Sequence, residues 1–168
     1  AGMVLTDNES ERDLVRSLRY HATGTAKLPY GYNSCISNDH ANILNFLLTK
    51  YKSLLARTQK VRKLYDTKLS DMGIVSIQTS DGTVSNNHKL VICVDDRDNL
   101  KKFLQDKEIE TQIHYTQPMS KMKMFKTDLE MPNADKFCEK ALSLPIHPFM
   151  KEKEIEFVCR CIGEFYGF

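Results

Sequence analysis

The sequence predicts an α+β protein, because one long segment with helical periodicity is followed by three short β-favouring runs and further helical segments. The long segment begins after Ser37, and its apolar residues recur every three or four positions until Gly73. The β-favouring runs fall at 74–77, 88–94 and 111–114, separated by a polar turn and a helical segment. We therefore expect a long connecting helix and a small antiparallel sheet covered by helices.

The first 37 residues predict a strand, a helix and a loop. Residues 1–6 form a short apolar run that favours a strand, and a helical pattern follows from Asp7 to Tyr20. An apolar strand at the very start is typical of the interior of a domain. Residues 22–37 are rich in Gly, Thr, Pro, Asn and Ser and have no apolar period, which predicts a loop.

The long helix is predicted over 38–72. Ser37 is a suitable N-cap, and Asp39 in the first turn complements the helix dipole. At 1.5 Å per residue the helix would extend for roughly 50 Å, more than a small domain needs. A helix of this length usually connects layers, domains or subunits. A kink or break near Thr58 is the alternative, because that turn lacks an apolar residue.

The remaining segments complete the sheet and its cover. Residues 95–98 are expected to cap a helix, and the methionine- and lysine-containing stretch 117–132 is predicted as a loop with one turn of helix. Helices are predicted at about 133–142 and 151–165, and two prolines stiffen the connection at 144–148.

Charge and hydropathy exclude several classes of protein. The 24 basic and 22 acidic residues give a net charge of +2, which is too balanced to indicate nucleic-acid binding. No apolar run approaches the roughly 20 residues of a transmembrane helix, so we expect a cytoplasmic protein without membrane contact. A basic stretch on the long helix is interpreted as its solvated face, with an anion-facing patch as the alternative. It comprises Lys50, Lys52, Arg57, Lys60, Arg62, Lys63 and Lys68.

Five cysteines occur in apolar patterns, and their odd number favours reduced thiols over a disulfide framework. Cys159 and Cys161 form a C-x-C pair. No second pair or nearby histidine supplies the other half of a tetrahedral ligand set, so we expect no metal site.

Two places offer candidate binding residues. His114 and Tyr115 end a predicted strand, where side chains face ligand crevices, and both have hydrogen-bonding tips. A packed pair with satisfied tips is the alternative. Asn33 is either a turn residue or an amide donor to a phosphate just before the helix, where Ser34, Ser37 and backbone amides could add donors.

Six segments, in order and spacing, resemble the second half of the DegT/StrS-type (DegT/DnrJ/EryC1/StrS) sugar aminotransferases, and the resemblance covers nearly the whole chain. These segments are Met3-Val4-Leu5-Thr6-Asp7-Asn8, Leu18-Arg19-Tyr20-His21, Gly31-Tyr32-Asn33-Ser34-Cys35-Ile36-Ser37-Asn38, Asp96-Arg97-Asp98, Thr111-Gln112-Ile113-His114-Tyr115-Thr116-Gln117-Pro118 and Ser143-Leu144-Pro145-Ile146-His147-Pro148.

The resemblance implies a division of the chain into three parts. Residues 1–37 would be a remnant of a large cofactor-binding domain with an interface loop, and 38–72 the connecting helix. Residues 73–168 would be the small C-terminal α+β domain of a type I aminotransferase fold.

The resemblance also implies a cofactor, partners and site residues. Family members use pyridoxal 5'-phosphate, work as homodimers and transfer an amino group, usually from glutamate, to a keto sugar carried on a nucleotide. By this resemblance Asn33 would reach the cofactor phosphate of the partner subunit, and His114 and Tyr115 would bind substrate near its entrance. Leu144 and Pro145 would be structural.

No lysine of this chain matches the family's cofactor-bearing lysine, which lies shortly before the segment with which this sequence opens. We therefore expect no catalytic residue here, no cofactor bound to this chain alone and no transamination by it. Four residues also depart from the family pattern: Cys35 replaces Arg or Lys, His40 replaces Gln, Glu108 replaces Gly and Ser120 replaces His. Loss of a cation near a phosphate weakens anion binding.

Two hypotheses follow. In the first, the chain is the C-terminal fragment of a working aminotransferase of amino-sugar or polysaccharide biosynthesis. In the second, it is a non-catalytic binding or regulatory module derived from the same fold. The order of the segments favours the first hypothesis, and the departures favour the second.

Overall fold

The computed structural model describes residues 2–24, 28–125 and 129–168. Ala1 of the predicted first strand and residues 25–27 and 126–128 of the two predicted loops lie outside the described residues. The chain divides into two compact units, 1–51 and 52–168, and each is described by itself.

The first unit contains the helix α1 (Glu9–Arg19), as predicted. Asn8 caps it, because its Oδ1 accepts the backbone N–H groups of Ser10 and Glu11 at 2.9 and 3.3 Å. The strand predicted over 1–6 is wrong for the described residues 2–6, which have no strand conformation. A strand exists only when another strand pairs with it, and no described residue pairs with this run.

Helix α2 (Asn38–Ser70) begins in the first unit and ends in the second. It remains helical through Thr58, so the break considered there is absent; the Thr58 hydroxyl donates to the carbonyl of Leu54 at 3.0 Å. Four buried residues of α2, Thr58, Val61, Tyr65 and Leu69, lie in its second half at spacings of three and four. This stripe faces the core of the second unit.

The sheet of the second unit is antiparallel and pairs β1 (Leu90–Cys93) with β2 (Ala141–Leu144). Two of the predicted strands, 74–77 and 111–114, are reduced to single bridges that flank this pair on either side. Ser76 bridges Ile92 of β1, and Gln112 bridges Ser143 of β2.

Strand β2 was not predicted. The helix expected over 133–142 is α4 (Pro132–Lys140), which ends at Lys140 and leads directly into β2. The run Ala-Leu-Ser-Leu has no β-branched residue and continues the apolar spacing of the helix, so periodicity alone does not separate the two. Pairing with β1 and burial of Leu142 and Leu144 determine the strand.

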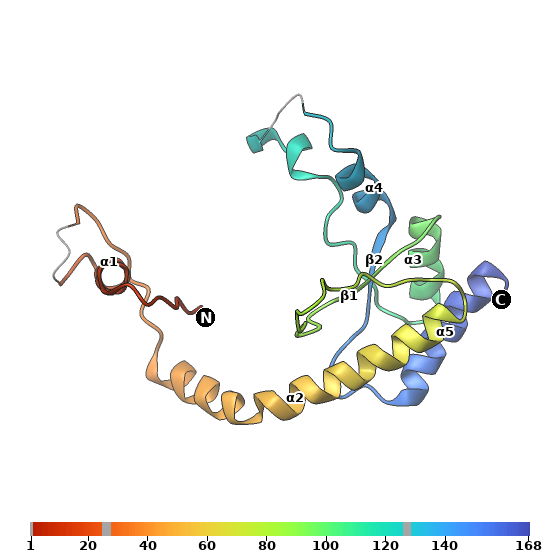
Figure 1. Cartoon of the computed structure of the whole chain (residues 1–168), viewed down its shortest axis with the longest axis horizontal. Coiled ribbons are helices and arrows are strands. Elements are labelled where there is room, and N and C mark those ends of the chain that lie inside the picture. The colour runs from red at the N-terminus through yellow and green to blue at the C-terminus, as the bar shows by residue number, and fades with distance from the viewer. Residues whose placement is uncertain (1, 25–27, 126–128) are drawn as a thin grey trace. The chain divides into compact units, whose positions relative to one another are not determined.

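Three helices pack with the sheet around one core. Helices α3 (Arg97–Asp106) and α5 (Glu152–Tyr166) contact each other, and α3 also contacts β2. The second half of α2 lies beside α5, where the Lys68 ammonium pairs with Glu156 at 3.1 Å (Figure 1). Leu90, Ile92, Leu100, Leu104, Leu142, Ile155 and Ile162 are fully buried between these elements. The α+β prediction is therefore confirmed.

The connection from Gln117 to Met131 contains two short 3-10 helices, Met119–Lys121 and Lys123–Phe125, instead of the single helical turn expected there. The following helix α4 starts at Pro132, where the missing N–H of proline costs no helical hydrogen bond. Lys121 forms an ion pair with Asp135 of α4, which ties this connection to the helix.

Candidate functional site

The turn at residues 31–33 is held by the backbone that follows α1. The Tyr32 N–H donates to the carbonyl of Leu18 at 2.6 Å, and the Tyr32 carbonyl accepts the His21 N–H at 3.0 Å. Gly31 lies so close to this backbone that an added Cβ would be 2.0 Å from the nitrogen of Ala22. Only glycine fits there, so the sequence of the turn is dictated by a close backbone approach.

Asn33 is exposed, and its backbone forms an antiparallel bridge with Tyr20. Among the described residues, none forms a hydrogen bond with its side-chain amide. The Ser34 N–H donates to the Arg19 carbonyl at 3.0 Å and is not available to a ligand. The exposed Cys35 thiol, 3.8 Å from the same carbonyl, brings no charge. The turn therefore offers the Asn33 side-chain amide and the exposed Ser34 hydroxyl.

Ser37 caps α2, as predicted. Its Oγ accepts the His40 N–H at 3.3 Å and lies 2.8 Å from the His40 Nδ1. His40 thus occupies the third helical position, where the side chain of a capping box returns to the cap. Because its hydroxyl is engaged with His40, Ser37 is not the free phosphate donor considered from the sequence.

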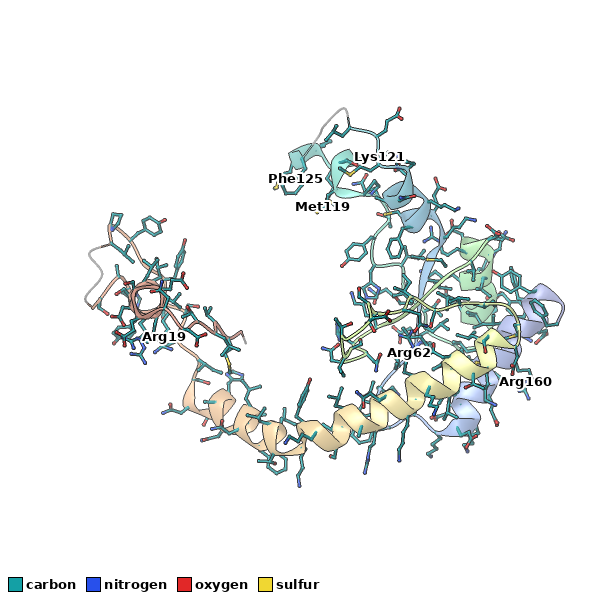
Figure 2. The ribbon with its side chains drawn as sticks, viewed as in Figure 1. Arg19, Arg62, Met119, Lys121, Phe125 and Arg160 are labelled. Carbon is teal, nitrogen blue, oxygen red and sulfur yellow. The ribbon has the colours of Figure 1, made fainter. Side chains whose placement is uncertain are left out.

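A hollow of about 380 Å³ lies beside this turn, between α1 and the following segment. Arg16 and Arg19 from the end of α1 line it together with Asp13 and Cys35. Figure 2 labels Arg19 on this helix. Arg12 hydrogen-bonds the Asp13 carboxylate at 2.9 Å and lowers its pKa. Arg16 and Arg19 form no ion pair within the described ranges, so the lining carries two arginines against one carboxylate, that of Asp13.

His114 and Tyr115 occupy a second place, at the edge of the sheet in the second unit. The His114 Nδ1 lies 2.9 Å from the Ser143 Oγ, and the backbones of Gln112 and Ser143 exchange hydrogen bonds of 3.1 and 2.9 Å. Strand β2 therefore orients the imidazole. Tyr115 is exposed, its ring centroid 6.3 Å from that of His114.

Lys89, the residue before β1, completes this group. Its Nζ lies 5.7 Å from the centroid of the Tyr115 ring, a cation–π contact. The pKa of His114 is lowered first by desolvation and then by the charges of Lys89 and His88. The sequence analysis missed Lys89. The signal that the sequence offers is a lysine directly before the apolar run of β1.

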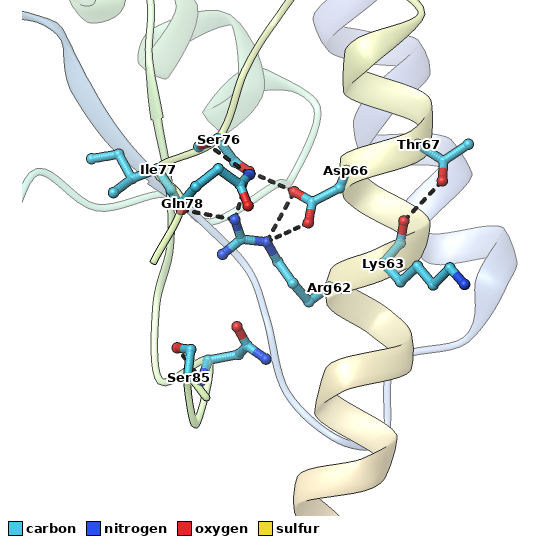
Figure 3. Close-up of polar contacts among 9 residues, drawn as sticks. Arg62, Lys63, Asp66, Thr67, Ser76, Ile77, Gln78 and Ser85 are labelled. Atoms are coloured by element: carbon cyan, nitrogen blue, oxygen red, sulfur yellow. Dashed lines mark hydrogen bonds and ion pairs between the residues drawn. The ribbon is translucent and has the colours of Figure 1, made fainter. Parts of the chain in front are cut away.

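A polar network fixes the segment that precedes this group (Figure 3). The Arg62 Nε of α2 donates to both carboxylate oxygens of Asp66 at 2.9 and 2.8 Å. One Arg62 terminal nitrogen donates to the Ser76 Oγ at 2.7 Å and to the Ile77 carbonyl at 2.8 Å. The Ser76 hydroxyl donates to Asp66 at 2.5 Å. Because the Ile77 N–H donates to Val91, the network joins α2 to β1.

Arg62 therefore departs from the solvated face predicted for the basic stretch of α2. Its side chain is 13% exposed, and Lys68 is also engaged, with Glu156. The other five members of the stretch are exposed: Lys50, Lys52, Arg57, Lys60 and Lys63.

The other departures have local consequences. Glu108 has a φ of 62°, a left-handed conformation that glycine adopts more readily than glutamate. Ser120 is buried, with 8% of its surface exposed, so it does not reach solvent as a binding residue would.

In the described ranges no three metal-ligating side chains gather, and all five cysteines are unpaired. The same ranges contain no helix with the length and hydropathy needed to cross a membrane.

Comparison with known proteins identifies relatives along the whole chain. A "Pleiotropic regulatory protein" of Geobacillus stearothermophilus is 29% identical over 178 residues, covering 98% of this chain and 47% of the relative. A "UDP-2-acetamido-2-deoxy-3-oxo-D-glucuronate aminotransferase" of Pseudomonas aeruginosa is 24% identical and covers 96% of this chain and 46% of the relative. The chain thus spans about half the length of these curated relatives.

Solved structures share the fold. A DegT DnrJ EryC1 StrS aminotransferase from Brucella abortus superposes with a TM-score of 0.87 at 24% identity, over 97% of this chain and 45% of that one. S. venezuelae DesV has the same TM-score at 23% identity. The family model of the DegT/DnrJ/EryC1/StrS aminotransferases matches residues 1–163. The chain belongs to the DegT/DnrJ/EryC1/StrS aminotransferase family.

Proposed function

We propose that this chain is the C-terminal part of a pyridoxal-phosphate-dependent aminotransferase that aminates a nucleotide-linked keto sugar. The family match over residues 1–163 carries the proposal. The coverage of about half of each relative supports a parent with a further domain. Residues 1–37 would belong to the large domain, 38–72 to the connecting helix and 73–168 to the small domain of a type I aminotransferase fold.

The names of several relatives support the substrate class. Besides the glucuronate aminotransferase, they include a "dTDP-4-dehydro-2,3,6-trideoxy-D-glucose 4-aminotransferase" of Saccharopolyspora spinosa and a "GDP-perosamine synthase" of Escherichia coli O157:H7. The nucleotides and sugars differ among these proteins. The proposal for this chain is therefore limited to a keto sugar on a nucleoside diphosphate.

The turn fits one end of the cofactor. Pyridoxal phosphate, when bound, supplies the electron sink for amino transfer. The Asn33 amide is exposed and unengaged among the described residues, as a donor to the phosphate of the partner subunit's cofactor must be. Gly31 holds the turn in place before any ligand arrives. Cys35 supplies no cation, so the contact that Asn33 would make to the phosphate is a neutral hydrogen bond.

The His114 and Tyr115 pair would bind the sugar nucleotide. Ser143 holds one imidazole nitrogen, which orients the other for a ligand. The exposed ring of Tyr115 is suited to stack on the face of a sugar or a base. The hydroxyl of Tyr115 is suited to form hydrogen bonds with the hydroxyl groups of the sugar. The roles of these residues are binding and orientation. The proton transfers of the reaction would belong to the large domain.

The proposal is tested on the complete product of the gene. We expect a coding region upstream that contains the cofactor-bearing lysine and an aspartate for the pyridine nitrogen. The complete product should transfer the amino group of glutamate to a nucleotide-linked keto sugar only when pyridoxal phosphate is present. We expect that the 168-residue chain alone, after treatment with pyridoxal phosphate and borohydride, has no one lysine that is specifically modified. Mass spectrometry of its peptides measures this.

Two outcomes would contradict the proposal. A complete product without a cofactor-binding domain would favour the non-catalytic module. A single lysine of this chain trapped stoichiometrically by borohydride would show that the chain carries its own cofactor site. The role of Asn33 at the partner's cofactor is tested separately. Asn33→Ala in the complete product should weaken the retention of the cofactor, while the molar mass of the complete product, expected to be that of a homodimer, should not change.

A further inference from the structure

Two basic side chains, Lys89 and His114, lie beside one exposed aromatic ring at the edge of the sheet, that of Tyr115. Lys89 is half-buried, with its ammonium 5.7 Å from the Tyr115 ring centroid. His114 lies next along the same edge, anchored on Ser143 at 2.9 Å. His88 is exposed and close enough for its charge to act on His114.

No acidic side chain balances this group within the described parts of the chain. None of the ion pairs there includes Lys89, His88 or His114. Desolvation and the charges of Lys89 and His88 all lower the pKa of His114, and no carboxylate opposes them. Most cations among the described residues form an ion pair or are exposed, whereas Lys89 is half-buried, forms no ion pair with a described residue and has its ammonium beside the Tyr115 ring.

Such an arrangement favours an anionic ligand. A partly desolvated ammonium binds an anionic oxygen more strongly than a fully hydrated one, because less water must be removed. The Tyr115 ring holds the ammonium in one place, which reduces the entropy lost on binding. The imidazole beside it adds a hydrogen-bond donor.

We propose that Lys89 is a specificity-determining residue that binds an anionic oxygen of the substrate beside His114 and Tyr115. The group it recognises is a phosphate of the nucleotide or a carboxylate on the sugar. This inference rests on the proposed function, because it names which part of a nucleotide-linked sugar the edge of the sheet selects. Lys89 adds a positive charge to a site where His114 and Tyr115 offer hydrogen-bonding groups.

The test follows the histidine ring signals of the full 168-residue chain by NMR during titration with three probes. Inorganic phosphate represents the nucleotide, glucuronate represents an acidic sugar, and glucose is the neutral control. We expect saturable shifts of the His114 ring protons with at least one anion and none with glucose. The anion that saturates at lower concentration identifies the source of the recognised oxygen.

Matched variants assign the effect to Lys89. Lys89→Met should weaken the affinity of the chain for the anion by about tenfold, as expected for the loss of one charge-assisted contact. Lys89→Arg should retain binding. Lys102→Met removes the same charge from an exposed site on α3 and should leave binding unchanged. Without ligand, Lys89→Met should also raise the pKa of His114, because it removes one of the charges that lower it.

Equal binding by wild type and Lys89→Met, or shifts that are the same with glucose, would overturn the inference. The titration needs neither cofactor nor amino transfer. An inactive complete product with intact anion binding would therefore contradict only the proposed function, and an active one without anion binding would contradict only the role of Lys89.

Discussion

Replacing Arg62 with methionine tests whether the network between α2 and β1 holds the second unit together. Methionine keeps the length of the aliphatic stem and removes the guanidinium. The change deletes the contacts to both oxygens of Asp66, to the Ser76 hydroxyl and to the Ile77 carbonyl. Ser76 retains its bond to Asp66, so the segment is weakened and not released.

The size of the effect follows from burial. Arg62 is 13% exposed and Asp66 33% exposed, so the pair lies between a surface ion pair and a buried one. Hydrogen bonds to charged groups contribute about 1.5–3 kcal/mol each but do not add, and the exposed part of the carboxylate is resolvated. We therefore expect Arg62→Met to lower the free energy of unfolding by about 2–3 kcal/mol.

Urea unfolding followed by far-ultraviolet circular dichroism measures this change, because the chain has no tryptophan for fluorescence. Lys60→Met is the matched control, since it removes the same charge from an exposed position on the same helix. In a double-mutant cycle with Asp66→Asn, the second substitution should cost much less in the Arg62→Met background. A loss below about 0.5 kcal/mol, or one equal to that of Lys60→Met, would refute the structural role assigned to the network.

Three further predictions concern backbone fit and thiol reactivity. Gly31→Ala should expose the Tyr32 amide to hydrogen exchange, since the added methyl would meet backbone at 2.0 Å; unchanged protection would disprove the close approach. Glu108→Gly should raise the melting temperature, because it relieves the backbone strain at φ 62° and raises the free energy of unfolding by about 0.5–1 kcal/mol. Glu108→Ala keeps a side chain at this φ and should not raise the melting temperature. Burial raises the pKa of Cys159 to about 11, so on the order of one thiol in a thousand is ionised at pH 8. Iodoacetamide should therefore modify the exposed Cys35 well before Cys159 in the native chain, and similar rates followed by mass spectrometry would contradict this burial.

The helices were predictable because each carries its own local signals. Asn8 and Ser37 stand at the N-termini of α1 and α2, where their side-chain oxygens accept backbone amides, and the spacing of the buried residues in α2 is visible in the sequence. The sheet was less predictable because pairing is a tertiary property. Residues 74–77 and 111–114 have strand composition, yet each makes only one bridge, while β2 forms from a run that reads as the end of a helix.

The candidate site was predictable only as separate residues. Asn33, His114 and Tyr115 stand out by residue type and position, and the structure brings His114 and Tyr115 together. Lys89 lies 25 or more residues before them, roughly the span of a strand, helix and return segment, so its approach to Tyr115 depends on the sheet. The engagement of Ser37 by His40 likewise becomes visible only once the cap has formed.

The two candidate binding places, each in its own unit, are held in shape by different kinds of contact. The Asn33 turn is fixed by backbone contacts with residues 18–22, including an approach that only Gly31 permits, so the backbone that carries the Asn33 amide is positioned before any phosphate binds. At the sheet edge, Lys89 and Tyr115 are held by side-chain contacts, which rearrange more easily than backbone. A ligand at the turn therefore has only the side chain of Asn33 to order, whereas a ligand at the edge meets an ammonium held by its contact with the Tyr115 ring. If the proposed function holds, the turn would make the same contact to the cofactor for every substrate, and the edge would discriminate between sugars through the charge of Lys89.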